Sequence, residues 1–301
     1  MTVNRAALRE HLWPGIYEIF GMEYKDHKTE YTDLYRVQRS KKAYEEYVME
    51  SAFGLAPPKA EGAAIMFDTA GDVWKGRVEM VSYALGFIVT REAVNDDQYF
   101  DLVPKYTRAL RRSMHITKEV RAAAFVDAAF STSTTGDGSA ICAVDHPLKG
   151  GGTFANRALA AADLNETSLE AAIIQIGGWT DERGLPIAAM AKKLHVPLSQ
   201  QFVAQRLLKT TGGRVGTSDH DINAISSMGM LPEGHCVNHY YSDPGAYFIT
   251  TDVTEGMTFW EREPLDLEEG DGSETQTMKV MAYERYAMSC QDPRGIWGMP
   301  G

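Results

Sequence analysis

The sequence predicts an α+β fold, and three observations support that prediction. One stretch of about 27 residues has the period of a single long helix, two stretches alternate like long strands, and a middle region mixes short helices with short strands. At 301 residues the chain exceeds one typical domain. We therefore expect a two-part body, or one domain with a large insertion.

The composition excludes several classes of protein. Hydrophobic residues make up 44% and aromatic residues 10%, which is ample for a packed core. The formal charge of −11 argues against a domain that grips phosphate backbones, since such domains are usually basic. The three cysteines, Cys142, Cys236 and Cys290, are far apart and form no CxxC pair, which indicates reduced thiols in a cytosolic product. The start of the chain has no signal-like apolar region, and no stretch reaches the roughly 18 apolar residues of a membrane span.

Residues 1–50 predict an extended N-terminal arm. They are polar and show no sustained helical or strand period. Aromatic side chains in an extended arm are expected to lie on another surface, and the alternative is a mixed loop and helix packed on its own domain. The tyrosines concerned are Tyr24, Tyr31, Tyr35, Tyr44 and Tyr47.

Residues 51–91 predict a long two-stranded hairpin. The stretches "GAAIMFDTA" and "GRVEMVSYALGFIVT" carry β-branched and aromatic residues, and Gly71 and Asp72 between them are typical turn residues. An isolated hairpin is marginally stable in water, so a projecting one is expected to need a partner surface.

The longest helix is predicted from Pro104, which is tolerated in a first turn, to about Phe130. Apolar or small residues at 106, 110, 114, 117, 120, 124 and 128 draw one buried stripe. The first half is basic, which fits either a solvated face or a face turned towards anionic neighbours or packaged nucleic acid. Its basic residues are Lys105, Arg108, Arg111, Arg112, Lys118 and Arg121.

Residues 153–255 alternate predicted helices and strands. "NETSLEAAIIQIGGW" begins with Asn165 or Thr167 as a helix cap and stops at Gly177 and Gly178. "AAMAKKLHVPLS" predicts a buried strand that ends at Pro197, and "SQQFVAQRLL" predicts a short amphipathic helix. "HCVNHYY" and "GAYFITTD" predict two strands around the turn "SDPG". Near the C-terminus, "TQTMKVMAYERYAMSC" predicts a long alternating strand.

One short stretch resembles an active site. Cys142, Asp145 and His146 lie within five residues, as a nucleophile, an acid and a base would. Cys142 lies in the apolar run "SAICAV", where a thiol more often packs as a small hydrophobic group. Asp145, His146 and Pro147 read as turn residues. A cytosolic hydrolase that uses Cys142 or His146 therefore stays a minor alternative, and we assign no catalytic residues.

The sequence gives no stronger indication of a ligand-binding site than of a catalytic site. His235 and His239 would share one face of a strand while Cys236 points away, but no second ligand pair is recognisable. The glycine-rich stretches "KGGGT" and "TTGGRVGT" match neither phosphate-binding pattern. The acidic run at 261–274 lacks the spacing of a calcium loop and reads as a solvated acidic turn. We assign no cofactor and no metal.

The order of these parts resembles the major capsid protein of tailed bacteriophages, in particular the Mu-like major head subunit group. Five stretches in the same order carry the resemblance: "YALGFIVTREAVNDDQYFD" with "LRRSMHITKEVRAAAFVDAAF", "VDHPLKGGGTFANRALAAADLNETSLEAAI", "TDERGLPIAAMAKKLHVPLSQQFVAQRLL", "DPGAYFITTD", and "YERYAMSCQDPRGIWG". Two features depart from the family. The strand after "DERG-P" is more apolar in most relatives than "KLHVP" here, and no long scaffolding segment precedes the arm. Such a segment is expected to be absent or supplied by a separate protein.

The resemblance implies a division of the chain into parts. It implies an N-terminal arm (1–50), an extended β-hairpin loop (51–91), a peripheral domain with the long spine helix (92–150 and 256–301) and an axial domain (151–255). In the family, the arm and the extended loop cover neighbouring subunits. Some relatives form covalent lysine–asparagine links, but no motif carries that chemistry to Lys59 or Lys75.

The implied function is structural and not enzymatic. The chain is expected to self-assemble as pentamers and hexamers into an icosahedral phage head around double-stranded DNA, which it would touch weakly and without sequence preference. Scaffolding, decoration and portal proteins are further candidate partners, and no membrane is involved. The expected location is the virion, after assembly in the host cytoplasm. An encapsulin-like nanocompartment, which packages an enzyme instead of a genome, is the other alternative.

Overall fold

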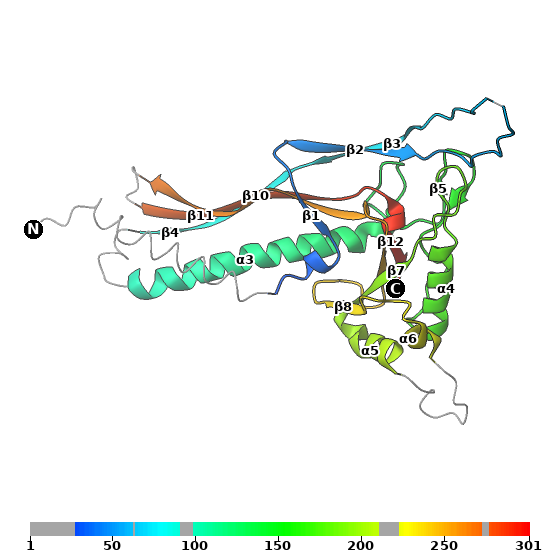
Figure 1. Ribbon diagram of the computed structural model, residues 1–301. Helices are drawn as coiled ribbons and strands as arrows, with labels where there is room; N and C mark the ends of the chain where they lie inside the picture. The colour runs from blue at the N-terminus through cyan, green and yellow to red at the C-terminus, as the bar shows by residue number, and fades with distance from the viewer. Residues whose placement is uncertain (1–27, 63, 91–98, 211–222, 273–276) are drawn as a thin grey trace, which may run out of the picture.

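The computed structural model describes residues 28–62, 64–90, 99–210, 223–272 and 277–301, which fold as a mixture of helices and sheets, as predicted. An elongated body carries one long helix beside a sheet, a more compact body lies at one end of it, and a hairpin with a long loop projects above both (Figure 1). Within the described ranges, none of the helices combines the length and the apolar composition that a membrane crossing requires.

The elongated body consists of helix α3 and a four-stranded sheet. The helix spans Tyr99–Asp127 and continues as a 3₁₀ turn, η2, over Ala128–Phe130. The strand order is β1-β10-β11-β4, in which β1 is parallel to β10 and the other neighbours are antiparallel. The strands are β1 (Arg36–Arg39), β4 (Val81–Val89), β10 (Met257–Gly272) and β11 (Thr277–Cys290).

Helix α3 differs from its prediction at its start and in its buried face. It begins at Tyr99, so Pro104 lies inside it and only removes one backbone hydrogen bond. The predicted apolar stripe holds at Leu110 and Met114, but Tyr106 and Val120 are exposed. The reason is that the helix buries a wide arc that includes polar residues. Members of this arc are Thr107, Arg111, His115, Lys118 and Glu119.

Strand β10 corrects the expectation of an acidic turn at 261–274, because it runs to Gly272 and pairs with β11. Its acidic residues alternate with apolar ones: Asp266 and Glu268 are exposed, whereas Leu267 between them is buried. The pairing register shifts on both sides of Glu263, next to Pro264, which has no N–H to donate to the ladder. On β11 the predicted alternation is confirmed, with Val280, Ala282 and Glu284 buried.

The compact body contains the second sheet, in the order β12-β9-β7-β8, and three helices. Leu169 and Ile176 of α4 pack against Leu194 of β7 and Ile249 of β9 in its core. The two strands predicted around "SDPG" exist, but they flank β7 instead of pairing with each other. The elements are α4 (Glu166–Gly177), β7 (Ala191–Pro197), η3 (Leu198–Gln200), α5 (Gln201–Lys209), α6 (Ala224–Met228), β8 (His235–Asn238), β9 (Tyr247–Thr251), η4 (Pro293–Gly295) and β12 (Ile296–Met299). A small sheet of β5 (His146–Pro147) and β6 (Thr153–Phe154) completes it.

The predicted hairpin is wrong in its strands. Gly71 and Asp72 do not form its turn: they begin β3 (Gly71–Glu79), which pairs antiparallel with β2 (Tyr44–Ser51). The chain from residue 71 to 89 is extended, as predicted, but the buried Met80 divides it, and β4 joins the sheet of the elongated body. Residues 52–70 are then the loop of the hairpin, and their described members lie in no strand.

The described end of the arm also differs from its prediction. Tyr31, in the 3₁₀ turn η1 (Tyr31–Asp33), and Tyr35 are buried in the protein's own core, against Phe259 of β10. The Tyr35 hydroxyl donates to the carbonyl of Ala122 in α3, at 2.8 Å. These two tyrosines therefore pack on the protein's own domain, which was the alternative expectation, and not on another surface. Residues 1–27, with Tyr24, lie outside the described residues.

Candidate functional site

Cys142 is not arranged as a nucleophile. Its side chain is fully buried, and burial raises the pKa of the thiol well above its usual value, against a smaller opposing effect of Arg157. The sulfur packs where a side chain on Gly298 of β12 would clash with it and with Phe130. The interpretation of this thiol as a small hydrophobic group is confirmed, and a thiolate is disfavoured here.

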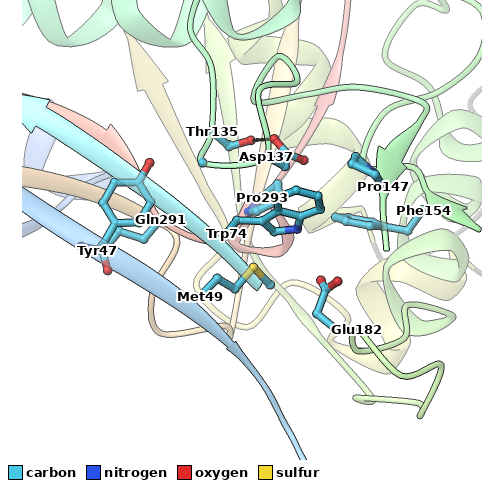
Figure 2. A pocket seen from close by; sticks show the side chains of 11 residues that line it. Tyr47, Met49, Trp74, Thr135, Asp137, Pro147, Phe154, Glu182, Gln291 and Pro293 are labelled. Atoms are coloured by element: carbon cyan, nitrogen blue, oxygen red, sulfur yellow. Dashed lines mark hydrogen bonds between the residues drawn. The ribbon is translucent and has the colours of Figure 1, made fainter. Parts of the chain in front are cut away.

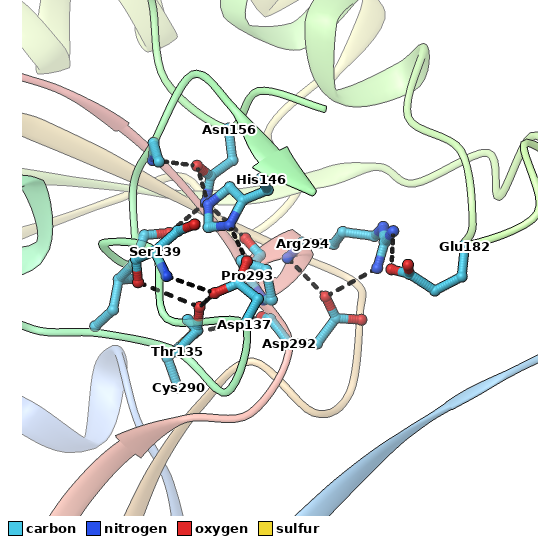
Figure 3. A network of polar contacts seen from close by, with 12 residues as sticks. Thr135, Asp137, Ser139, His146, Asn156, Glu182, Cys290, Asp292, Pro293 and Arg294 are labelled. Carbon is cyan, nitrogen blue, oxygen red and sulfur yellow. Dashed lines mark hydrogen bonds and ion pairs between the residues drawn. The ribbon is translucent and has the colours of Figure 1, made fainter. Parts of the chain in front are cut away.

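His146 is part of a buried polar network (Figure 3), and its acidic partner is Asp137. Asp145, which the sequence places next to it, is exposed. The Nδ1 of His146 lies 2.6 Å from Oδ2 of Asp137, and the Nε2 lies 3.1 Å from Oδ1 of Asn156. The Asn156 amide nitrogen donates to three backbone carbonyls, of Ile141, Pro293 and Ile296, so Oδ1 is its acceptor.

Both ring nitrogens of His146 therefore have polar partners within the protein. Burial tends to raise the pKa of Asp137, but the hydrogen bonds from His146, Thr135 and the Ser139 backbone outweigh it and lower that pKa. This buried hydrogen-bond network ties the loop at 131–145 to the segment around Asn156. With its nitrogens occupied in this way, His146 is not placed to act as a base.

A second buried network centres on Arg294, which connects the C-terminal segment to the compact body (Figure 3). Its Nη2 lies 2.7 Å from Oε1 of Glu182, its Nε donates to the carbonyl of Thr180 at 3.0 Å, and its guanidinium lies over the Phe154 ring. The other Glu182 oxygen accepts the backbone N–H of Lys149 at 3.0 Å. Glu182 thus fixes two chain segments at once.

His235 and His239, which the sequence places on one face of a strand, do not share a strand in the structure. Strand β8 ends at Asn238, so His239 leaves the strand and its Nδ1 lies 2.6 Å from Oε1 of Glu30. Cys236 donates its S–H to Asp33 at 3.2 Å. Burial and the Asp33 carboxylate raise the pKa of this thiol to about 12. Throughout the described part of the chain, no three His, Cys, Asp or Glu side chains are grouped so that they could hold a metal ion.

The glycine-rich stretches show no phosphate cradle in the described part. Gly151 and Gly152 of "KGGGT" have positive φ angles, and the Leu148 N–H donates to the carbonyl of Gly152. This is the geometry of a tight turn between β5 and β6. The second stretch, "TTGGRVGT", falls largely on residues 211–222, outside the described residues.

The most conspicuous unsatisfied surface is the loop at residues 52–70, which we call the projecting loop. Its large apolar side chains are exposed to solvent: the exposed fraction is 83% for Leu55 and 89% for Phe67. Large exposed apolar groups that follow one another on a loop are typical of an interaction site. The loop's other exposed large apolar residues are Phe53, Ile65 and Met66.

The hairpin behind the loop rests on the body by close packing (Figure 2). Tyr47, Met49 and Trp74 of the hairpin and Phe154, Pro147 and Pro293 of the body line a cavity of only about 10 Å³. The Tyr47 hydroxyl donates to the carbonyl of Cys290 at 3.1 Å, and Gly136 approaches the backbone of Gly76. So small a space holds at most one water molecule and no substrate.

Sequence reasoning missed Asp137, Asn156, Glu182 and Arg294. Asp137 reaches His146 across a loop of nine residues, and the other three have partners that are distant along the chain. The separations are 137 residues for the contact of Asn156 with Pro293 and 112 for that of Glu182 with Arg294. A signal existed in the glycine-rich, polar composition of residues 131–157, which is unusual for a region that carries buried side chains.

Comparisons with known proteins agree with this geometry. A family profile described as phage capsid protein matches residues 76–298. No curated protein sequence matches the chain.

Several solved structures share the fold. The capsid of an empty GTA particle is 14% identical over 91% of each chain, with a TM-score of 0.57. The capsid of Cyanophage P-SCSP1u is 11% identical over 91% of this chain and 88% of that one, with a TM-score of 0.56. A virus-like particle from Pyrococcus furiosus is 11% identical over 94% and 96%, with a TM-score of 0.52. Identities this low show a common fold and nothing more.

Proposed function

The chain belongs to the phage capsid protein family and is a structural subunit of a phage head, and from that premise we propose that its copies assemble as pentamers and hexamers into an icosahedral shell around double-stranded DNA. The observation that carries the proposal is the projecting loop. A single subunit leaves the apolar side chains of this loop in water, and a neighbouring copy is the partner that a shell always supplies.

The parts of the chain take different tasks in this proposal. The predicted peripheral domain (92–150 and 256–301) corresponds mainly to the elongated body, with α3 as its spine. The predicted axial domain (151–255), at the centre of each ring, corresponds mainly to the compact body, which also includes β5 and β12. The projecting unit is better bounded by β2 and β3, from Tyr44 to Met80, than by residues 51–91, because β4 belongs to the sheet of the elongated body. Of the predicted arm (1–50), Tyr31 and Tyr35 belong to the subunit's own core, and residues 44–50 belong to the projecting unit.

The basic residues of α3 support weak contact with packaged DNA. Arg111 and Lys118 are buried, and Lys118 is paired with Glu284, whereas Lys105, Arg112 and Arg121 are exposed. A few exposed cations on a chain of charge −11 fit loose, non-specific contact with phosphates and not a tight grip. Scaffolding, decoration and portal proteins would complete the particle, which would assemble in the host cytoplasm.

Replacing Leu55 and Phe67 together by serine tests the proposal. Both side chains are exposed in the subunit, so its free energy of unfolding should change by less than about 0.5 kcal/mol. Loss of two apolar groups from the interface should raise the protein concentration needed for shell formation at least about tenfold, measured by light scattering.

The matched control is Leu159→Ser, which removes an equally exposed leucine outside the loop, at 88% exposure. Normal assembly of the loop variant would refute the docking role of the loop. The contents of wild-type shells decide between the two kinds of container: nuclease-resistant DNA supports the phage head, and a packaged enzyme supports the nanocompartment.

A further inference from the structure

The projecting loop is held from the side by a turn of the compact body, at residues 181–186. Asp181 organises this turn: its Oδ1 accepts the backbone N–H groups of Arg183 and Leu185, each at 2.8 Å. Its backbone exchanges further hydrogen bonds with Leu185 and Gly184, and Gly184 has the positive φ of 83° that the turn requires. The turn presents the Arg183 side chain towards the loop.

Arg183 holds the loop through both ends of its guanidinium. Its Nη1 donates to Oδ2 of Asp68 at 2.5 Å, and its Nη2 donates to the carbonyl of Thr69 at 2.6 Å. The same Asp68 oxygen accepts the backbone N–H of Gly54 at 2.8 Å, so Asp68 also closes the base of the loop. Hydrogen bonds from Gly54 and the Thr69 backbone, together with Arg183, lower the pKa of Asp68.

A second cation supports the same side of the hairpin. The Lys149 ammonium donates to the carbonyl of Asp72, at the start of β3. Glu182 links Lys149 and Arg183: it accepts the Lys149 N–H, precedes Arg183 in the turn and is paired with the buried Arg294. Exposed polar contacts thus tie the loop to a part of the compact body that is anchored by a buried ion pair.

These contacts do not hide the apolar side chains of the loop. Leu55 and Phe67 remain almost fully exposed while Arg183 holds Asp68. If these contacts held the loop in an inactive position against the body, we would expect them to cover its apolar groups. Instead they fix the direction of the loop and leave those groups in water. Such contacts lower the conformational entropy that is lost when the loop docks.

We propose that Arg183, assisted by Lys149, is a positioning residue that holds the projecting loop in the orientation in which it docks on a neighbouring copy of this chain. This inference rests on the proposed function, because it assumes that the loop docks on a second copy. It adds the residue that prepares the loop before docking.

The test compares Arg183→Gln with wild type in two measurements on the full chain. The first is the rate of tryptic cleavage after Lys59, an exposed loop residue, in unassembled protein. The second is the protein concentration at which shells form. An exposed ion pair contributes little, so release of the loop should raise both quantities about two- to fivefold. Arg206→Gln, which removes an exposed arginine of α5, is the matched control and should leave both unchanged.

Further variants separate positioning from a general loss of charge. Arg183→Lys should behave between wild type and Arg183→Gln in both measurements, since a lysine keeps the charge but not the two hydrogen bonds of the guanidinium. Because Arg183 contacts Asp68, the effects of Arg183→Gln and Asp68→Asn should be less than additive in the double variant.

Each remaining outcome decides the matter. Unchanged cleavage at Lys59 in Arg183→Gln overturns the positioning role, and so does faster cleavage with unchanged or easier shell formation. If wild type forms no shells under any condition, the proposed function fails, while the cleavage rate at Lys59 still tells whether Arg183 holds the loop.

Discussion

Two buried ion pairs among the described residues, Lys118–Glu284 and Arg294–Glu182, join elements that are far apart in the chain. The Lys118 ammonium in α3 lies 2.7 Å from Oε2 of Glu284 in β11. Burial raises the pKa of Glu284, and Lys118 opposes that shift. Because removal of one partner leaves an uncompensated buried charge, such pairs constrain how the helix and the sheet meet.

His195 of β7 is a buried residue whose ionisation opposes the fold. Burial, aided by Lys193, lowers its pKa to about 3, so the native protein keeps it neutral where an unfolded chain would take up a proton. Protonation of His195 in the unfolded chain should therefore leave the free energy of unfolding unchanged above about pH 6.5. Below that it should lower the free energy of unfolding by about 1.4 kcal/mol per pH unit as the pH falls towards 3.

His195→Gln removes this proton uptake. In urea unfolding between pH 7 and pH 4, wild type should lose stability more steeply than the variant. Parallel curves would contradict the assignment of this acid sensitivity to His195.

Single residues were predictable where their surroundings are local in sequence. Cys142 lies in an apolar run, and the thiol is buried as expected. The partner of His146 was not predictable, because Asp137 reaches it across a loop whose shape depends on Asn156 and on the C-terminal segment. His195 lies in the "KLHVP" stretch that departs from the family, and it is buried, as the prediction of a buried strand there requires.

At the scale of elements, helix α4 illustrates how capping chemistry sets a boundary. Sequence alone left Asn165 and Thr167 as alternatives, and the structure selects Asn165. Its side chain accepts the Ser168 N–H at 2.9 Å, while the Ser168 hydroxyl accepts the Asn165 N–H at 3.1 Å.

Asn165→Ala should therefore lower the free energy of unfolding by about 1 kcal/mol, because it leaves first-turn N–H groups without their partner. Thr167→Ala, two residues later and exposed, is the control and should change it by less than about 0.5 kcal/mol. Chemical denaturation measures both, and equal losses would show that the cap does not act as described.

Elements with a clear period and local end signals were predictable, as α4, β7 and β11 show. Strand β10 was not predictable, because its many charged residues and Pro264 give it the composition that is typical of a loop. The hairpin was misplaced because residues 71–89 form one extended run, and only the pairing of β3 with β2 and of β4 with β11 assigns its halves to different sheets.

The whole molecule is a subunit with its own buried cores and a projecting loop whose described large apolar side chains are exposed to water. The buried Tyr31 and Tyr35 show that the end of the arm belongs to the subunit itself. The projecting loop does not, since its apolar side chains contact no core cluster among the described residues. Assignment to the Mu-like group, and the division into peripheral and axial domains, stay predictions.

The most direct test of this account is electron microscopy of the purified wild-type protein over a range of concentrations. We expect closed round particles, and a reconstruction in which residues 52–70 of each subunit lie against a neighbouring copy, with Leu55 and Phe67 out of contact with water. A protein that stays monomeric at high concentration, with this loop folded onto its own body, would contradict the account.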